Sequence, residues 1–246
     1  MNVIVPKAAK EWARWQLGLE SWTSTIVWID PWQFESLAQS EEVKQLWMNI
    51  DQFKVVHCVS PEAAQALIDQ LDIYWPMIPA GVNWTCNGPG TANVLNQHDL
   101  PTQYPEAGYT AEDVIELVAT LLEPHDSVLI VKGEGGRNAF KEYFASTGQK
   151  ATEVFVYRRL VDNNVLAQIV EQADTSDALW LSSSFLGEAL LQQNGEYWRS
   201  WSGQWWVSSD RLKQWCLDNG LVNVKLAADA SVDALATMLR NQQGEL

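Results

Sequence analysis

The sequence predicts an α/β protein built mainly on parallel sheets. Short apolar runs, many of them rich in valine and isoleucine, alternate with amphipathic helical patterns along the chain, which is typical of repeated βα units. The 246 residues are enough for one large domain or for two domains of ordinary size. A hydrophobic fraction of 47% is typical of a packed globular protein and excludes a disordered chain.

The predicted strands are the short apolar runs, and helices are expected in the gaps between them. The strands are Val3–Val5, Thr25–Ile29, Lys54–Val59, Val82–Cys86, Val128–Val131, Glu153–Arg158, Ala178–Leu181, Gln204–Val207 and Asn223–Leu226.

Some of the helices have a recognisable start. Ser60-Pro61-Glu62 places a capping serine, a proline at the first helical position and an acid in the positive first turn. Thr110-Ala111-Glu112-Asp113 resembles a capping box in which aspartate replaces the usual glutamate or glutamine. Ser231-Val232-Asp233 begins a final helix that is expected to end near Gln242.

The charge balance and the cysteines exclude several classes of function. Sixteen lysines and arginines against 31 aspartates and glutamates give a net charge of −15, which disfavours nucleic acid or an anionic membrane as a partner. The sequence has no apolar run of about 18 residues, and its N-terminus has no basic region followed by a long apolar stretch, so we expect a soluble, cytoplasmic protein. Cys58, Cys86 and Cys216 are widely spaced and form no CxxC pair, so neither a disulfide nor a zinc site is predicted.

The fourteen tryptophans are an unusually large number for this length. We interpret most of them as packing residues, because tryptophan buries a large area and has a single polar group. A surface for stacking a flat ligand stays open for Trp205 and Trp206.

The segment from Val128 to Arg159 carries the clearest functional pattern. A buried strand is followed by Lys132-Gly133-Glu134-Gly135-Gly136-Arg137, then by a helical stretch and a second strand. The turn is no dinucleotide fingerprint, because position 138 is Asn, and it lacks the Gly-Lys-Ser/Thr of a Walker A loop. Backbone amides at a helix start, together with Lys132 and Arg137, favour a carboxylate ligand instead.

Polar turns follow other predicted strands. Asn87-Gly88-Pro89-Gly90-Thr91-Ala92 again places free amides and a hydroxyl at a helix start, although a capped turn explains the same residues equally well. Ser60 and Ser182-Ser183-Ser184 also follow strands, where serine is a good helix cap.

Tyr157 is the candidate for chemistry, because it lies near the end of a predicted strand. A phenol is protonated at neutral pH and can donate a proton to a departing hydroxyl, although a tyrosine that packs its ring at a sheet end fits the spacing too. Arg158 and Arg159 alternate sides of the strand, so at most one is expected beside Tyr157. His57 lies inside an apolar strand, which favours a hydrogen-bonded core histidine.

The order of a strand, a Gly-Arg turn and a Tyr-Arg-containing strand resembles the uroporphyrinogen-III synthase family. Gly88 and Thr91-Ala92 match the Gly-x-x-Thr-Ala turn of that family. Val59–Ala63 and Leu181–Ser184 are similar to the strand ends of its two lobes. At Val207–Arg211 the second Gly-x-x-Thr-Ala turn of the family is missing, and Arg211 is the residue that can supply a carboxylate contact there.

The resemblance implies two flavodoxin-like α/β lobes with parallel sheets. In the family, two strands link the lobes, and the chain passes from one lobe to the other along each of them. The substrate lies in the cleft between the lobes. Asp30-Pro31 and Asp162-Asn163-Asn164 break the chain directly after two predicted strands. If those two strands are the connectors, residues 31–161 form an inserted domain, and residues 1–30 with 162–246 form the other.

The resemblance also implies a function in tetrapyrrole biosynthesis. The family converts linear hydroxymethylbilane to uroporphyrinogen III, with loss of water and inversion of ring D, and it needs neither a cofactor nor a metal. It implies Tyr157 as the catalytic residue, a monomer, and transient contact with the upstream deaminase. The implied substrate-binding residues are Ser60, Gly88, Thr91, Lys132, Gly133, Arg137, Ser183, Ser184 and Arg211.

Two other functions stay open at this point. One is a non-catalytic module of the same fold that binds a tetrapyrrole or another small ligand, because the second-lobe turn is altered. The other is a flavodoxin-like or periplasmic-binding-like domain with an unrelated ligand.

Overall fold

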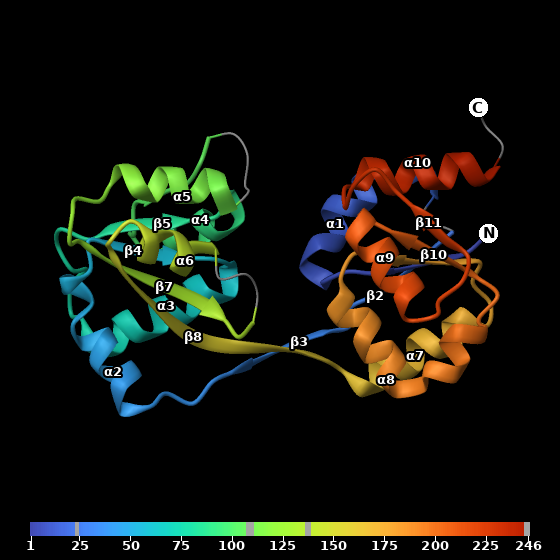
Figure 1. The fold of residues 1–246 in the computed structure, drawn as a ribbon, viewed down its shortest axis with the longest axis horizontal. Helices are drawn as coiled ribbons and strands as arrows, with labels where there is room; N and C mark the ends of the chain where they lie inside the picture. Colours follow the sequence, from blue (N-terminus) through green and yellow to red (C-terminus); the bar gives the residue numbers. More distant parts are fainter. Residues whose placement is uncertain (23–24, 107–110, 136–138, 244–246) are drawn as a thin grey trace. The chain divides into compact units, whose positions relative to one another are not determined.

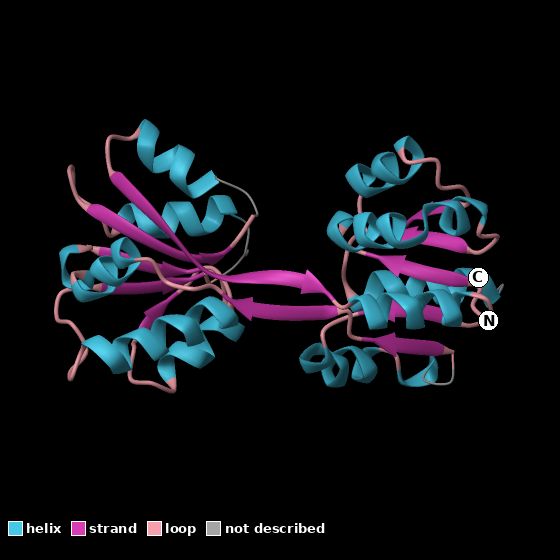
Figure 2. Ribbon diagram, turned by 90° about the horizontal axis from the view of Figure 1, so that it is seen from below, coloured by secondary structure: helices cyan, strands magenta, loops and turns pink. Residues whose placement is uncertain are grey.

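The computed structural model describes residues 1–22, 25–106, 111–135 and 139–243. The contacts within the chain divide it into two compact units (Figure 1). Unit 1 is residues 1–33 with 160–246, and unit 2 is residues 34–159. Each unit is built on its own sheet, with helices on both faces (Figure 2). These sheets and helices confirm the predicted α/β class.

The sheet of unit 1 has the strand order β11-β10-β9-β1-β2 in the described residues, and the neighbouring strands are parallel. Its strands are β1 (Val3–Pro6), β2 (Ile26–Ile29), β9 (Ala178–Leu181), β10 (Gln204–Val207) and β11 (Val224–Leu226). The helices of the unit are α1 (Ala9–Gly18), α7 (Asn163–Ala173), α8 (Ser184–Ser200), α9 (Asp210–Asp218) and α10 (Val232–Gln243), with a 3-10 turn at Glu20–Trp22.

The described strands of unit 2 have the order β3-β8-β7-β4-β5-β6. They are β3 (Trp32–Ser36), β4 (Val55–Cys58), β5 (Asn83–Cys86), β6 (Thr102–Gln103), β7 (Ser127–Gly133) and β8 (Lys150–Val161), and all the pairs from β8 to β6 are parallel. The helices are α2 (Glu41–Met48), α3 (Pro61–Tyr74), α4 (Pro89–Asn96), α5 (Ala111–Thr120) and α6 (Ala139–Ser146), with a 3-10 turn at Ile50–Gln52.

Alternating side chains of the central strands bury both faces of the unit 2 sheet. Val56 of β4 belongs to the buried cluster that contains Leu67 of α3, whereas Val55 belongs to the cluster of Val118 in α5 and Phe144 in α6. Successive side chains of a strand point to opposite faces, so an apolar run is needed where both faces are covered. This double burial explains why the predicted strands are unbroken apolar runs.

Six tryptophans of unit 1 are buried in its core: Trp15, Trp180, Trp198, Trp201, Trp205 and Trp206. Trp198, Trp201 and Trp205 pack edge to face, with ring centroids 5.3 to 5.5 Å apart. Trp206 is buried on the opposite face of the sheet, against the cluster that contains Trp15. Trp205 and Trp206 both have 0% exposure, so the stacking surface left open for them is excluded. The interpretation as packing residues is confirmed for these side chains.

Two of the predicted helix starts are confirmed. The Ser60 hydroxyl accepts a hydrogen bond from the Ala63 N–H at 3.1 Å, and the Ser231 hydroxyl accepts one from the Ala234 N–H at the same distance. The expected capping residue Thr110 lies outside the described residues.

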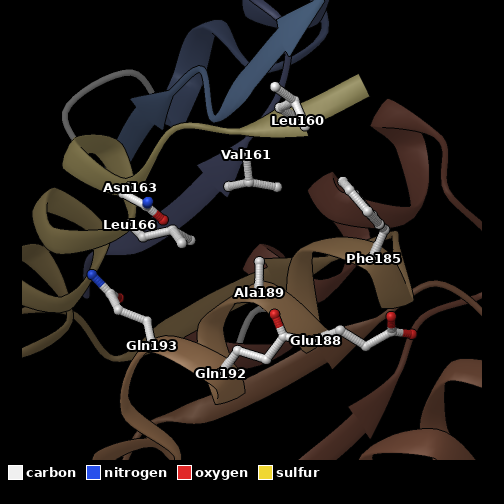
Figure 3. Close-up of a pocket in the computed structure, with 9 residues that line it drawn as sticks. All are labelled: Leu160, Val161, Asn163, Leu166, Phe185, Glu188, Ala189, Gln192 and Gln193. Atoms are coloured by element: carbon white, nitrogen blue, oxygen red, sulfur yellow. The ribbon is translucent and has the colours of Figure 1, made fainter. Parts of the chain in front are cut away.

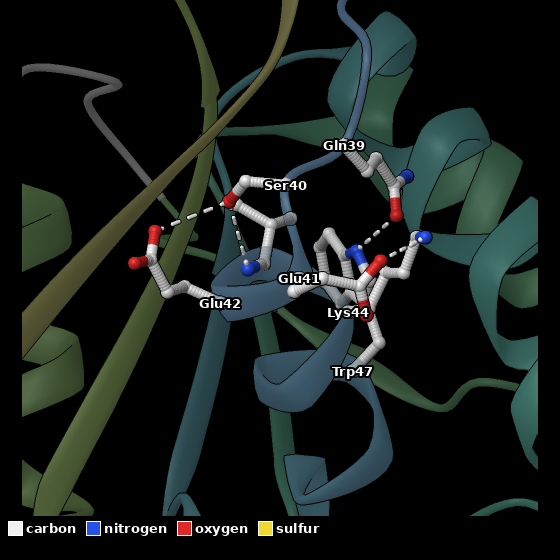
Figure 4. Close-up of polar contacts among 7 residues, drawn as sticks. Gln39, Ser40, Glu41, Glu42, Lys44 and Trp47 are labelled. Carbon is white, nitrogen blue, oxygen red and sulfur yellow. Dashed lines mark hydrogen bonds and ion pairs between the residues drawn. The ribbon is translucent and has the colours of Figure 1, made fainter.

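The start of α2 was not predicted. The Ser40 hydroxyl accepts a hydrogen bond from the Val43 N–H at 3.3 Å, and Lys44 pairs with Glu41 at 2.5 Å (Figure 4). The Trp47 indole N–H donates to the Gln39 side-chain oxygen at 3.0 Å and so ties the helix to the segment before it.

The expected pairing of connector strands is wrong in one respect. The predicted strand Thr25–Ile29 is β2, and it pairs with β1 inside unit 1. The strand beside β8 is instead β3, which begins after Pro31. Hydrogen bonds lie at both ends of this pair: the Asp162 N–H donates to the Pro31 carbonyl, and the Leu37 N–H donates to the Val156 carbonyl. Apolar periodicity missed β3 because most of its side chains are exposed. The chain passes from one unit to the other within β3 and within β8.

Among the described residues, every helix is too short or too polar to span a membrane.

Candidate functional site

The polar turns of unit 2 meet at one edge of its sheet. Ser60 follows β4, Asn87 and Gly88 follow β5, and β7 ends at Gly133. Because β4 is parallel to both β5 and β7, the carboxyl ends of these strands lie at the same edge. In the pairing of β7 with β8, Gly133 lies opposite Tyr157. The register shifts by one residue between Lys132, which lies opposite Phe155, and Gly133. The structure therefore brings Ser60, Gly88, Gly133 and Tyr157 together.

Tyr157 is held from several sides at this edge. Its hydroxyl lies 3.0 Å from the Ser60 hydroxyl, and either oxygen can be the donor. The Phe34 ring contacts the Tyr157 ring edge to face, with centroids 5.5 Å apart. On the third side lies Gly133, where a Cβ atom would be 2.4 Å from the ring. Because Gly133 has no side chain, the phenol can approach the backbone and reach Ser60.

Arg158, the residue after Tyr157, is paired with glutamates. The Arg158 guanidinium donates to both carboxylate oxygens of Glu134, at 2.6 and 3.2 Å, and lies 3.9 Å from Glu35. The hydrogen bond from Arg158 lowers the pKa of Glu134. The Glu134 N–H also donates to the Tyr157 carbonyl at 2.8 Å, so Glu134 joins the end of β7 to β8 through both its backbone and its side chain.

The structure gives Lys132 a partner inside the protein. Its ammonium lies 3.1 Å from Glu153, and both side chains are 8% exposed. Lys141 of α6 lies 3.9 Å from the other oxygen of Glu153. A buried lysine is stabilised by such a partner, so the charge of Lys132 is already balanced. Arg137 lies outside the described residues.

The Gly88 turn leads into α4. Gly88 is the N-cap residue, and its carbonyl accepts hydrogen bonds from the Thr91 and Ala92 N–H groups at 3.1 Å each. Thr91 is buried, with 4% exposure. The turn therefore presents the backbone of Gly88 more than the side chain of Thr91.

A buried polar network lies directly behind this edge. The His57 ring is 3.0 Å from the Thr85 hydroxyl through Nδ1 and 2.9 Å from the Asn87 side-chain oxygen through Nε2. The Asn87 amide donates to the Val59 carbonyl at 2.9 Å. His57 and Thr85 have 0% exposure, and burial lowers the pKa of His57 to about 4. The prediction of a hydrogen-bonded core histidine is confirmed. Its hydrogen bond to Asn87, the residue that joins the turns after β4 and β5, was not apparent from the sequence.

The predicted residues of unit 1 lie at the carboxyl ends of β9 and β10. Ser183 is the N-cap residue of α8, and Ser184 is its first residue. Arg211 is exposed in the first turn of α9, after Ser209, whose hydroxyl caps that helix. The Arg211 side chain is therefore open to solvent, and its role as a carboxylate contact stays a prediction.

Unit 1 also contains a pocket of about 330 Å³ between the end of β8 and helices α7 and α8 (Figure 3). Val161, Leu166 and Phe185 contribute apolar surface, and Asn163, Glu188 and Gln192 contribute polar groups. The residues that line this pocket include neither lysine nor arginine and none of the predicted site residues. Its chemistry does not suit a carboxylate ligand.

Two α/β units with hydroxyl-bearing turns at the carboxyl ends of parallel strands define a class of proteins that bind small molecules at these strand ends.

The model of the family described as uroporphyrinogen-III synthase HemD matches residues 18–242. The chain therefore belongs to the uroporphyrinogen-III synthase family. This match confirms the predicted resemblance and supports the synthase function. It does not favour the non-catalytic module. Membership implies an enzyme of tetrapyrrole synthesis.

Solved structures agree on the fold. A mutant uroporphyrinogen III synthase from the extremely thermophilic bacterium Thermus thermophilus is 13% identical, with 100% of both chains covered and a TM-score of 0.60. The uroporphyrinogen-III synthetase from Helicobacter pylori is 12% identical, with 98% of this chain and 100% of that chain covered and a TM-score of 0.61. At these identities the likeness concerns the fold alone.

The contact between Gly133 and Tyr157 predicts a structural effect. In Gly133→Ala the new Cβ would lie 2.4 and 2.5 Å from two ring atoms of Tyr157, so the ring must move. We expect a crystal structure of this variant to show the phenol beyond hydrogen-bond distance of Ser60. Gly90→Ala is the matched control, because its Cβ meets no atom within 4 Å. An unchanged Ser60–Tyr157 distance in Gly133→Ala would contradict this account.

The buried His57 predicts a dependence of stability on pH. Its folded-state pKa of about 4 lies below the ordinary value of 6.5, so between these values the unfolded chain binds a proton that the folded chain does not. The stabilisation is therefore complete above pH 6.5, and about 3 kcal/mol is lost as the pH falls to 4. Urea unfolding of the wild type and His57→Gln at several pH values measures the difference. Parallel pH profiles of the two proteins would show that His57 does not titrate in this way.

Proposed function

We propose that this chain converts linear hydroxymethylbilane to uroporphyrinogen III as a cyclising hydro-lyase, with Tyr157 as the catalytic acid. The match of the synthase family over residues 18–242 is the observation that carries the reaction. The position of Tyr157, hydrogen-bonded to Ser60 at the carboxyl edge of the unit 2 sheet, supports its assigned role.

The proposed chemistry begins with the departure of the substrate hydroxyl. The electrons of the adjacent pyrrole nitrogen expel it, and the Tyr157 phenol donates a proton so that water leaves. The azafulvene that remains forms a bond with the substituted carbon of ring D, and a spiro intermediate rearranges to the inverted macrocycle. The proton lost when the ring regains aromaticity returns to Tyr157. With Ser60 as the donor, the 3.0 Å hydrogen bond stabilises the phenolate in between.

The main task of the enzyme is then to position a flexible chain. Hydroxymethylbilane also closes unaided to the uninverted isomer, so the fold must hold ring D in the inverting geometry before simple closure occurs. The acetate and propionate groups of the substrate are the carboxylates by which the protein can bind and orient it. This task needs no nucleophile, metal or cofactor, and we propose that none is used.

Carboxylate binding requires cations, and unit 2 concentrates them in one segment. Between Lys54 and Lys132 the sequence contains neither lysine nor arginine, whereas six of these residues lie from Lys132 to Arg159. This segment includes the glycine-rich turn and β8. Among the described cations, Lys132, Arg158 and Arg159 lie next to Tyr157 in the chain or in the register of β7 with β8, which supports anion binding there despite the net charge of −15.

We assign the binding residues accordingly. Arg137 and Arg211 would pair with substrate carboxylates, and Lys132, whose charge Glu153 already balances, would hold the end of β7 in place through that ion pair. Thr91 is buried, so it would support the turn. The residues that would contribute backbone amides or hydroxyls are Ser60, Gly88, Gly133, Ser183 and Ser184.

We further propose that the protein works as a monomer in the cytoplasm, with transient contact with the deaminase that supplies its substrate. Its three cysteines are buried thiols, and burial raises the pKa of Cys86 to about 11 and that of Cys216 to about 12. Such thiols are inert in a reducing compartment. The proposed domains, residues 1–30 with 162–246 and residues 31–161, differ from the two contact-defined units by two or three residues at each boundary.

The proposed reaction predicts the isomer of the product. We expect purified protein given freshly generated hydroxymethylbilane to yield mainly uroporphyrinogen III, which separation of the oxidised products by isomer would measure. Formation of isomer I alone, at the rate without protein, would refute the synthase reaction and leave a binding protein of this fold.

The acid role predicts the effect of removing one hydroxyl. We expect Tyr157→Phe to lower kcat about 100-fold, at the low end of the contribution of a general acid, with a smaller change in KM. Tyr143→Phe is the matched control, because Tyr143 lies in α6 and is 39% exposed. Turnover that is equal in the two variants would remove Tyr157 as the main acid.

A further inference from the structure

We infer that His57 is a positioning residue of this site, because its buried ring connects the two turns that follow β4 and β5 with the start of α6. The inference rests on the proposed role of Tyr157 in the reaction. His57 itself has 0% exposure and lies behind the edge, so it acts through other residues.

The direction of each hydrogen bond in the network follows from its last acceptor. The Val59 carbonyl can only accept, so the Asn87 amide nitrogen donates to it and the Asn87 oxygen faces His57. That oxygen also only accepts, and His57 must therefore carry its hydrogen on Nε2. His57 Nδ1 is then an acceptor, and the Thr85 hydroxyl donates to it. Each of these groups has a partner that matches its chemistry.

The network ends one residue before the serine that holds the phenol. The Val59 carbonyl belongs to the peptide group that leads into Ser60, and a peptide group is planar. Asn87 holds this carbonyl, and the Val59 N–H donates to the Val131 carbonyl of β7 at 3.1 Å. Because hydrogen bonds fix both the N–H and the carbonyl of Val59, the backbone orientation at Ser60 is fixed as well. The Ser60 hydroxyl lies 3.0 Å from the Tyr157 hydroxyl.

The face of the ring makes the third connection. The Phe140 ring stacks on His57, with centroids 4.6 Å apart and an interplanar angle of 18°. Phe140 is the second residue of α6, the helix that follows the glycine-rich turn. A movement of this helix start would therefore be resisted by the same imidazole that orients Asn87.

The chemistry of the network explains why the residue is a histidine. The position requires a donor towards Asn87, an acceptor towards Thr85 and a flat face towards Phe140. A neutral imidazole supplies all three at once. Glutamine can still donate to Asn87 but has no ring to stack, and leucine can do neither.

The first test observes the ring directly. We expect two-dimensional ¹H–¹⁵N NMR of the histidine side chains to show His57 as the Nε2–H tautomer from pH 6 to 8, with its signal assigned by its loss in His57→Gln. An Nδ1–H tautomer or a charged ring in this range would overturn the assigned directions. This readout does not depend on turnover, so it is informative even if the proposed reaction fails.

The second test separates positioning from a general loss of structure. We expect His57→Leu and Asn87→Leu to lower kcat about 10-fold or more with less effect on KM, because small displacements of a catalytic group are costly. His57→Gln should recover part of the loss, because it can still donate to Asn87. His125→Gln is the control, because His125 is exposed and outside this network. Equal kcat in His57→Leu and the wild type would overturn the inference.

A double-mutant cycle tests whether His57 acts through Tyr157. If it does, His57→Leu should lower kcat little in the Tyr157→Phe background, because the two changes affect one contact. Equal losses in both backgrounds would indicate a structural role only and would overturn the inference. If Tyr157→Phe alone leaves kcat unchanged, the acid assignment fails. The positioning is then judged by the Ser60–Tyr157 distance in a crystal structure of Asn87→Leu, where an unchanged distance of 3.0 Å would overturn it.

Discussion

The parallel pairing of β4 with β5 and β7 is the constraint on which the candidate site depends. The register places Cys58 beside both Cys86 and Val131, so the residues that follow these strands start from the same level. Parallel strands carry all their carboxyl ends to one edge, where turns and helix starts present N–H groups and hydroxyls. Ser60, Asn87 and Gly133 are neighbours for this reason, although long stretches of sequence separate them.

Within that arrangement, the missing side chain of Gly133 and the buried ring of His57 have complementary effects. The glycine leaves room for the Tyr157 ring on one side of the edge. The histidine orients Asn87, and through it the Val59 carbonyl, on the other side. The hydrogen bond between Ser60 and Tyr157 joins the two sides. The reactive phenol is thus held by packing and by polar contacts to separate strands, which limits its freedom before any substrate binds.

Electrostatics presents this protein with a conflict, because an acidic chain must bind a substrate rich in carboxylates. Lys132 and Arg158 lie beside Tyr157 in the chain or in the register of β7 with β8, and glutamates hold both: Glu153 pairs with Lys132, and Glu134 pairs with Arg158. These glutamates orient the cations but also compete with the substrate for them. Arg158 and Glu134 are exposed, so water weakens their pairing and the competition is modest. The buried pair of Lys132 and Glu153 is less open to exchange.

The sequence by itself determined the α/β class and most strands, because runs such as Val128–Val131 are buried on both faces and must be apolar. It also determined the capped start of α3 and the motifs that resemble the synthase family. It did not reveal β3, whose side chains are mostly exposed, or β6, which has two residues. Only the tertiary structure decided that Tyr157 meets Ser60, that Glu153 neutralises Lys132, and that His57 orients Asn87, which joins two turns. These contacts link residues far apart in the chain, and a local pattern carries no information about which distant side chain lies within hydrogen-bond distance.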